Sequence, residues 1–242
     1  MRKWLILAAL SGLAACSDGE TAPDTTPQEA AIPAAGQRET PESALPAVPR
    51  GRDIQVLAFG DSLLAGYNLP RSEAYPAQLE AALRARGIDA TVINAGVSGD
   101  TTAAGLQRLD FVLDGLERKP ALAIVEFGGN DLLRGLSPSL ARDNLDAMLA
   151  RFAQEDIPVV IMGLEAPPSA GSEYRRQFNA IYPELAEKYD AALVPMFIAP
   201  LIEDRTLVQA DQIHPTRNGV AAMVSSTIDT IASAAQKAAA DE

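Results

Sequence analysis

The sequence predicts an α/β domain in which helices cover both faces of a parallel β-sheet. Two observations lead to this fold class. Short, nearly continuous apolar segments, typical of strands buried on both faces, alternate with longer segments of helical periodicity. This alternation continues through most of the chain, which is the pattern of strand–helix–strand units. With 242 residues, 48% of them hydrophobic, the chain has room for one such domain and an additional segment.

A leader is predicted at residues 1–16. Its basic start is followed by an apolar run that is too short for a stable membrane span but suits a secretory signal. The only cysteine of the chain, Cys16, directly follows Leu-Ala-Ala. This resembles a bacterial lipoprotein signal and implies that Cys16 is lipidated, with Ser17 favouring a periplasmic position on the outer membrane. An ordinary signal peptide, with Cys16 incidental, is the alternative.

Residues 17–50 are predicted to be a disordered tether. Six prolines are scattered among Ala, Thr, Glu and Ser, with almost no large apolar residue. Such a segment cannot bury enough surface to offset the entropy of ordering it. The folded domain is therefore expected at residues 51–242.

The first half of this domain is expected to contain two strands and two helices. Segment 54–59 is apolar and reads as the first strand, and helix 75–86 carries apolar residues at helical spacing before it ends at Gly87. Segment 90–95 reads as the second strand. The helix that follows it is capped by Thr101 or Thr102.

The second half adds three strands, at 121–127, 157–162 and 192–194. An amphipathic helix that starts at Ser137 or Ser139 lies between the first two, and a helix at 173–189 lies between the last two. Pro183 inside that helix predicts a kink or a break. A final helix is expected at 216–236.

The turns after the first three strands are the glycine-rich ones, at residues 60–62, 96–100 and 128–131. In parallel sheets of this kind, ligands bind beyond the carboxyl ends of the strands. We therefore expect these three turns to meet at one edge of the sheet and to form the functional site.

Ser62 and His214 are the candidates for nucleophile and base. Ser62 lies between a strand and a helix, where its hydroxyl is exposed near backbone N–H groups. His214 is the only histidine of the chain, and an imidazole is suited to general-base chemistry near neutral pH. Asp211, three residues earlier, can accept a hydrogen bond from the imidazole. The alternatives are an ordinary turn serine and a surface histidine beside an unrelated acid.

Asn130 and Gly99 are candidates for stabilising an oxyanion. The Asn130 amide is a neutral donor at the end of an apolar strand, and Gly99 allows a close approach of its backbone N–H. Each also has an ordinary role as a turn residue. Asp61 and Asp100 lie in glycine-rich turns, where carboxylates bind local N–H groups, and we assign both to support of the turns.

Four blocks carry a resemblance to a known family. They are Phe-Gly-Asp-Ser-Leu at 59–63, Asn-Ala-Gly-Val-Ser-Gly-Asp-Thr at 94–101, Glu-Phe-Gly-Gly-Asn-Asp at 126–131 and Asp-Gln-Ile-His-Pro at 211–215. Together they resemble the SGNH/GDSL hydrolases, closest to the bacterial arylesterase and thioesterase I/lysophospholipase type, over about residues 54–236. The resemblance implies a flavodoxin-like three-layer α/β/α sandwich with a five-stranded parallel sheet.

The resemblance also implies roles for the site residues. Ser62 would be the nucleophile, His214 the base and Asp211 the orienting acid, with an oxyanion hole formed by Ser62 N–H, Gly99 N–H and the Asn130 side chain. Two features depart from the thioesterase pattern. Residues 165–171, where the family shapes its acyl pocket, differ in detail, and the leader and tether are additions.

The expected activity is hydrolysis of short-to-medium acyl or aryl esters, with thioesters and lysophospholipids as further substrate classes. No metal or cofactor is expected. Tyr67, Leu132, Leu133 and Leu136 are candidates for an apolar acyl or aryl site, although core packing is the commoner role of such residues. Two alternatives are a carbohydrate O-deacetylase with the same triad and a non-catalytic lipoprotein that binds an envelope partner.

Composition excludes several other classes. The formal net charge of −12 argues against a nucleic-acid partner, which needs clustered Lys and Arg. One cysteine excludes an internal disulfide and a CxxC redox pair. One histidine excludes a His-rich metal site.

Overall fold

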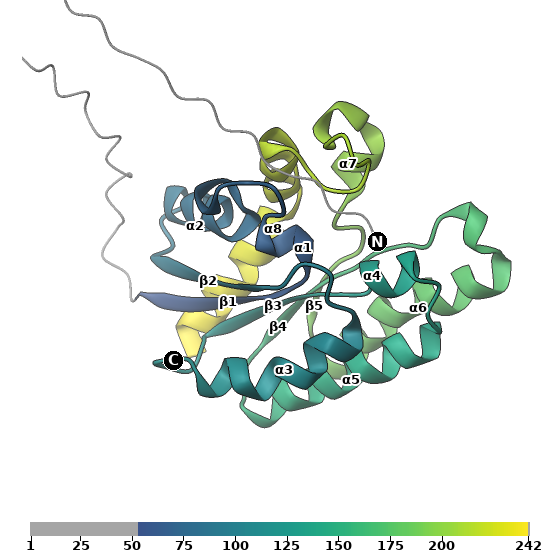
Figure 1. The fold of residues 1–242 in the computed structure, drawn as a ribbon. Coiled ribbons are helices and arrows are strands. Elements are labelled where there is room, and N and C mark those ends of the chain that lie inside the picture. Colours follow the sequence, from purple (N-terminus) through teal and green to yellow (C-terminus); the bar gives the residue numbers. More distant parts are fainter. Residues whose placement is uncertain (1–52, 242) are drawn as a thin grey trace, which may run out of the picture. The chain divides into compact units, whose positions relative to one another are not determined.

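The expected sheet is confirmed as a five-stranded, all-parallel sheet with the strand order β2-β1-β3-β4-β5 (Figure 1). The computed structural model describes residues 53–241; the predicted leader with Cys16 and the predicted tether lie outside them. The strands are β1 (Ile54–Gly60), β2 (Ala90–Gly96), β3 (Leu122–Glu126), β4 (Val159–Met162) and β5 (Ala192–Val194).

Helices form a layer on each face of the sheet, which gives the α/β/α sandwich (Figure 1). The helices of one face are α1 (Ser62–Ala65), α2 (Tyr75–Ala85) and α8 (Arg217–Asp241). Those of the other face are α3 (Thr102–Asp114), α5 (Pro138–Gln154) and α6 (Ser172–Tyr189). The remaining elements are the short helices α4 (Gly129–Leu133) and α7 (Ala199–Glu203) and the 3-10 turns Arg71–Glu73, Pro168–Ala170 and Arg205–Leu207.

A hydrophobic core fills the space on each side of the sheet. On one side Tyr75 of α2 is fully buried, and its hydroxyl lies 2.6 Å from Thr227 Oγ1 of α8. On the other side Phe59, Phe127 and Phe152 pack edge to face. Each buried side chain of this size stabilises the fold by roughly 1.5–3 kcal/mol. The two cores hold the sheet between rigid layers, and this fixes the strand ends that carry the site.

The element boundaries agree closely with the expected ones, with two differences. The helix expected at 173–189 is not broken at Pro183, because α6 runs continuously from Ser172 to Tyr189. Proline has no N–H to donate to the carbonyl group four residues earlier in the helix. Pro183 lies on the exposed face of α6, where solvent can hydrogen bond to that carbonyl group instead. The last helix is also longer than expected and ends at Asp241. Within residues 53–241, no helix combines the length and the apolar character that a membrane span requires.

Candidate functional site

The carboxyl ends of β1, β2 and β3 lie at one level. In the sheet register Gly60 of β1 pairs with Gly96 of β2 on one side and with Glu126 of β3 on the other. The three glycine-rich turns therefore leave the sheet side by side, as the sequence predicts. The turn after β5 and the loop before α8 complete this edge.

Ser62 is the first residue of α1, and Asp61 caps this helix. The Asp61 carboxylate accepts a hydrogen bond from Leu63 N at 3.1 Å, so the turn is fixed directly at the serine. A Cβ atom on Gly96 would lie 2.4 Å from Ala65 N. Glycine at this position thus allows α1 to pack directly against the end of β2, which holds Ser62 at the sheet edge.

His214 links Ser62 to Asp211. Its Nε2 atom lies 2.9 Å from Ser62 Oγ, and its Nδ1 atom lies 2.7 Å from Asp211 Oδ2. The other Asp211 oxygen accepts hydrogen bonds from the backbone N–H groups of Ile213 and His214, each at 3.0 Å. The hydrogen bond from the His214 side chain, followed by these backbone bonds, lowers the pKa of Asp211 to about 2.

Two neighbours brace the loop that carries Asp211 and His214. The backbone of Gln212 has a positive φ of 64°, and Arg205 Nη2 donates to the Gln212 carbonyl at 2.9 Å. The ring of Tyr67 lies against the imidazole of His214, with 4.2 Å between the ring centroids. The packed ring and the guanidinium bond both restrict the positions that His214 can adopt.

Asn130 lies at the start of α4, and Gly128 before it has a φ of 112°. Its Nδ2 atom donates to Asp61 Oδ2 and to the carbonyl of Asp100, both at 2.9 Å. The amide thus joins the turns after β1, β2 and β3. Both of its hydrogen atoms have acceptors within the protein in this arrangement.

Gly99 occupies the turn after β2 and has a φ of 87°. Within the described residues, neither the Gly99 N–H nor the Ser62 N–H donates a hydrogen bond to another protein group. The Gly99 carbonyl accepts from Arg134 Nη2 at 2.7 Å, which holds this turn against α4. Both donors therefore remain available at the cavity that these turns line.

Arg108 and Asp131 are supporting residues that the sequence reading did not identify. Arg108 of α3 forms an ion pair with Asp100 at 2.6 Å and donates to the Gly60 carbonyl at 2.9 Å. Asp131 accepts from Thr102 N at 2.9 Å and from Thr102 Oγ1 at 2.6 Å, which ties α4 to the start of α3. Asp131 lies in the block at 126–131, and Arg108 pairs with Asp100 of the block at 94–101, but in both cases the partner belongs to another element.

A cavity of about 520 Å³ opens at this site. Ser62, His214, Gly99 and Asn130 line it. Of the residues expected to form an acyl or aryl site, Tyr67, Leu132 and Leu133 lie in its wall, whereas Leu136 does not. The structure thus gives no support for Leu136 as a substrate-binding residue: its carbonyl instead accepts from the Tyr174 hydroxyl at 2.9 Å. Apolar wall residues that sequence reasoning missed come mainly from the segment after β5 and the loop at His214: Ile198, Leu201, Ile202 and Ile213, together with Leu164.

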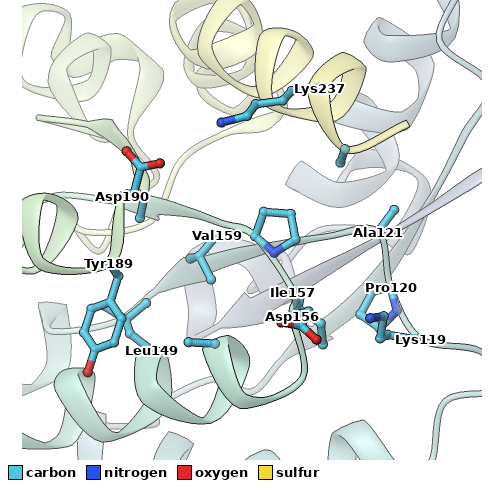
Figure 2. Close-up of a pocket in the computed structure, with 14 residues that line it drawn as sticks. Lys119, Pro120, Ala121, Leu149, Asp156, Ile157, Val159, Tyr189, Asp190 and Lys237 are labelled. Carbon is cyan, nitrogen blue, oxygen red and sulfur yellow. The ribbon is translucent and has the colours of Figure 1, made fainter. Parts of the chain in front are cut away.

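A second cavity, of about 500 Å³, lies where β3 and β4 begin, at the opposite edge of the sheet from Ser62 (Figure 2). Its wall includes Leu149, Ile157 and Val159, and charged side chains such as Lys237 and Asp190 lie around it. The residues that line it include no serine or histidine. Of these two cavities, the one at Ser62 has the groups needed for nucleophilic chemistry.

The described residues contain no group of three or more His, Cys, Asp or Glu side chains arranged to hold a metal ion. The chemical groups of the site are a hydroxyl, an imidazole, a carboxylate and hydrogen-bond donors. This set is the one that acyl transfer through a serine nucleophile uses.

Comparison with known proteins identifies the family. The model of the GDSL-like Lipase/Acylhydrolase family matches residues 58–222. An arylesterase of Vibrio mimicus is 40% identical over 161 residues, which are 66% of this chain and 80% of that protein. The esterase TesA of Pseudomonas aeruginosa is 39% identical over 160 residues, which are 66% of this chain and 79% of that protein.

A solved structure supports the same assignment. The crystal structure of AlinE4, described as an SGNH-hydrolase family esterase, is 56% identical and has a TM-score of 0.66, covering 77% of this chain and 98% of that one. The match of sequence family, fold and site chemistry leads to one conclusion. The chain belongs to the GDSL-like lipase/acylhydrolase family, and it is an ester hydrolase.

Proposed function

We propose that this enzyme is a serine esterase that hydrolyses short-to-medium acyl or aryl esters through a triad of Ser62, His214 and Asp211. The observation that carries the proposal is the position of the His214 imidazole between the Ser62 hydroxyl, at 2.9 Å, and the Asp211 carboxylate, at 2.7 Å. These are hydrogen-bond distances suited to proton transfer from a hydroxyl to a base.

In the first half of the reaction, Ser62 Oγ attacks the ester carbonyl carbon while His214 Nε2 takes the hydroxyl proton. Asp211 keeps the Nδ1–H tautomer and stabilises the imidazolium. The tetrahedral intermediate then collapses, its bond to the leaving oxygen breaks, and His214 returns the proton to the leaving alcohol. In the second half, water attacks the acyl-enzyme with His214 again as base, which releases the acid and restores Ser62.

The oxyanion of each tetrahedral intermediate would be stabilised by Ser62 N–H, Gly99 N–H and the Asn130 amide. The two backbone donors have no competing acceptor in the described part of the chain. Asn130 already donates to Asp61 and to Asp100, so one of its hydrogens must be shared with the oxyanion or redirected to it. Donors aimed at developing charge contribute most when they are held in place beforehand, and these two acceptors hold the amide.

The cavity wall supports an apolar substrate. Leu132, Leu133 and Ile202 present aliphatic surface near Ser62, and Tyr67 adds an aromatic ring beside His214. An acyl chain or an aryl leaving group would bury its surface there, at about 25 cal/mol per Å². Thioesters and lysophospholipids fit the same chemistry, and the names of the relatives include an arylesterase and a thioesterase 1/protease 1/lysophospholipase L1 of Escherichia coli.

The proposal is tested by steady-state hydrolysis of p-nitrophenyl butyrate by the wild type and Ser62→Ala. We expect Ser62→Ala to lose about 10⁴-fold or more in kcat, because the nucleophile is absent. Ser225→Ala, which changes an exposed serine of α8, is the matched control and should keep wild-type activity. A fluorophosphonate probe should label the wild type and Ser225→Ala but not Ser62→Ala. Full activity in Ser62→Ala would refute the mechanism.

Acyl specificity is tested by a chain-length series of p-nitrophenyl esters and acyl-CoA thioesters on the same enzyme. An optimum at short to medium oxygen esters is expected, and a clear preference for long-chain thioesters would contradict the proposed substrate class.

For the N-terminus, the proposal is a lipid anchor at Cys16 on the periplasmic side of the outer membrane. It predicts that Cys16→Ala releases the protein from the membrane fraction of bacteria.

A further inference from the structure

Glu126 is a buried carboxyl group to which the proposed mechanism assigns no role. It is the last residue of β3, its exposed fraction is 0%, and it pairs across the sheet with Gly60. A Cβ atom on Gly60 would lie 2.8 Å from Glu126 Oε2. Glycine at position 60 therefore leaves the space in which this carboxyl lies against the end of β1, directly before Asp61 and Ser62.

Glu126 has few partners for a charged group. Its Oε2 atom accepts one hydrogen bond, from Asp61 N at 3.2 Å, and no donor within the described residues reaches Oε1. No arginine, lysine or histidine in residues 53–241 forms an ion pair with it. Asp61 affects the pKa of Glu126, and Glu126 affects the pKa values of Tyr75 and Tyr182. None of these three groups is a cation. An ionised carboxylate in this position would be strongly destabilised.

Asp61, the neighbouring carboxyl, is much better supplied with donors. It accepts from Leu63 N at 3.1 Å and from Asn130 Nδ2 at 2.9 Å. Two adjacent buried carboxylates cannot both be ionised without strong repulsion, so the pair is expected to hold one proton. The proton belongs on the group that has fewer donors, which is Glu126. In agreement, burial and then the charge of Asp61 raise the pKa of Glu126 well above its usual range.

We infer that Glu126 is protonated in the active enzyme and acts as a positioning residue: its carboxyl hydrogen bonds to the Asp61 carboxylate, which in turn orients the Asn130 amide and the turn at Ser62. Burial raises the pKa of Asp61, and the hydrogen bonds from Leu63 N, from the Glu126 carboxyl and from Asn130 oppose this rise by favouring the ionised form. Asp61 then offers a fixed negative acceptor to Asn130 Nδ2, which keeps the amide near the oxyanion position. This inference rests on the proposed function, because it assigns Asn130 to the oxyanion hole.

The test uses E126Q and E126L, with E187L as the control for a Glu-to-Leu change on the exposed face of α6. A glutamine can still donate to Asp61 from its amide and accept from Asp61 N, so E126Q should keep kcat on p-nitrophenyl butyrate within about threefold. E126L removes the donor to a charged acceptor, and its kcat should fall about tenfold or more. KM should stay within about twofold, because Glu126 does not touch the substrate cavity.

The second readout is infrared spectroscopy, which detects an un-ionised carboxyl by its carbonyl band and that band's shift in deuterated water. At neutral pH the wild type should show this band and E126Q should lack it. The inference is overturned if the wild type has no such band, if the band persists in E126Q, if E126L keeps wild-type kcat, or if E126Q is as impaired as E126L. The infrared comparison needs no folded E126L.

Failure of the proposed function gives a different result. In that case the wild type would not hydrolyse the ester, or Ser62→Ala would remain active, whatever the protonation state of Glu126. A folded wild type that depends on Ser62 but not on Glu126 would refute this inference alone.

Discussion

The replacement Asp211→Asn gives the sharpest prediction for the triad, because it alters one proton position and little else. Asp211 Oδ1 accepts from Ile213 N and His214 N, each at 3.0 Å, so the asparagine oxygen is held by these two donors. The new NH₂ group then takes the place of Oδ2, which lies 2.7 Å from His214 Nδ1. A donor in that position requires an unprotonated Nδ1, and the imidazole must carry its proton on Nε2 instead.

The consequence for activity follows from the second contact of His214. Its Nε2 atom lies 2.9 Å from Ser62 Oγ, and once protonated it can no longer accept the serine proton. We expect kcat for p-nitrophenyl butyrate to fall about 10⁴-fold, which corresponds to about 5.4 kcal/mol at 1.36 kcal/mol per factor of ten. More than about a hundredth of wild-type kcat in a folded Asp211→Asn variant would refute the tautomer argument.

Asp204→Asn is the matched control. Asp204 also accepts from a backbone N–H two residues later, Thr206 N at 2.9 Å, and its pKa is also lowered, first by the Thr206 side chain. Asp204 does not contact His214, so its asparagine variant should keep wild-type kcat.

Stability gives a further check on Asp211→Asn. Because the folded pKa of Asp211 is about 2, below the usual 3.8, its contribution to stability is fully present above about pH 4. It should be lost as the pH falls toward 2. The difference in Tm between the wild type and Asp211→Asn should therefore shrink as the pH falls from about 4 to about 2. An undiminished difference at pH 2 would contradict the lowered pKa.

Two further predictions concern groups around the triad. Asn130→Ala should lower kcat about 100-fold or more with a small change in KM, because it removes the proposed oxyanion donor and the link between Asp61 and Asp100. Retention of a tenth of wild-type kcat would contradict this. Tyr182→Phe removes the buried hydrogen bond from the Tyr182 hydroxyl to the Phe127 carbonyl. Urea titrations should show that the free energy of unfolding falls by about 1 kcal/mol. An unchanged free energy of unfolding would mean that this bond makes no net contribution to stability.

The sheet could be predicted from the sequence because its strands are almost purely apolar. Segments 54–59 and 90–95 agree with β1 and β2 to within one residue, and β5 is found at the expected residues. The convergence of the glycine-rich turns also followed from strand pairing alone, since parallel strands place their carboxyl ends at one edge. Secondary structure, the parallel sheet and the meeting of Ser62 with the other turns thus followed from local patterns, whereas the strand order did not.

Side-chain partners across elements could not be predicted in the same way. The segment between β5 and His214 has no clear periodicity, and its residues Leu201, Ile202 and Arg205 were missed although all three line the cavity. Leu136 was expected at the cavity together with Leu132 and Leu133, but it is not among the residues that line the cavity. Which apolar side chains face a cavity depends on tertiary packing, and spacing along the chain does not fix it.

Asp61 shows how the structure extends a correct but incomplete expectation. The sequence assigned it to support of its own turn, and the bond from Leu63 N agrees with that role. Its second oxygen, however, accepts from Asn130, and its backbone N–H donates to the Glu126 carboxyl at 3.2 Å. The one acid adjacent to Ser62 in the sequence therefore contacts the turn after β3 and makes no hydrogen bond to His214 within the described residues. In the proposed mechanism Asp211 orients the imidazole that receives the Ser62 proton, and Asp61 holds the Asn130 amide that donates to the oxygen that gains charge.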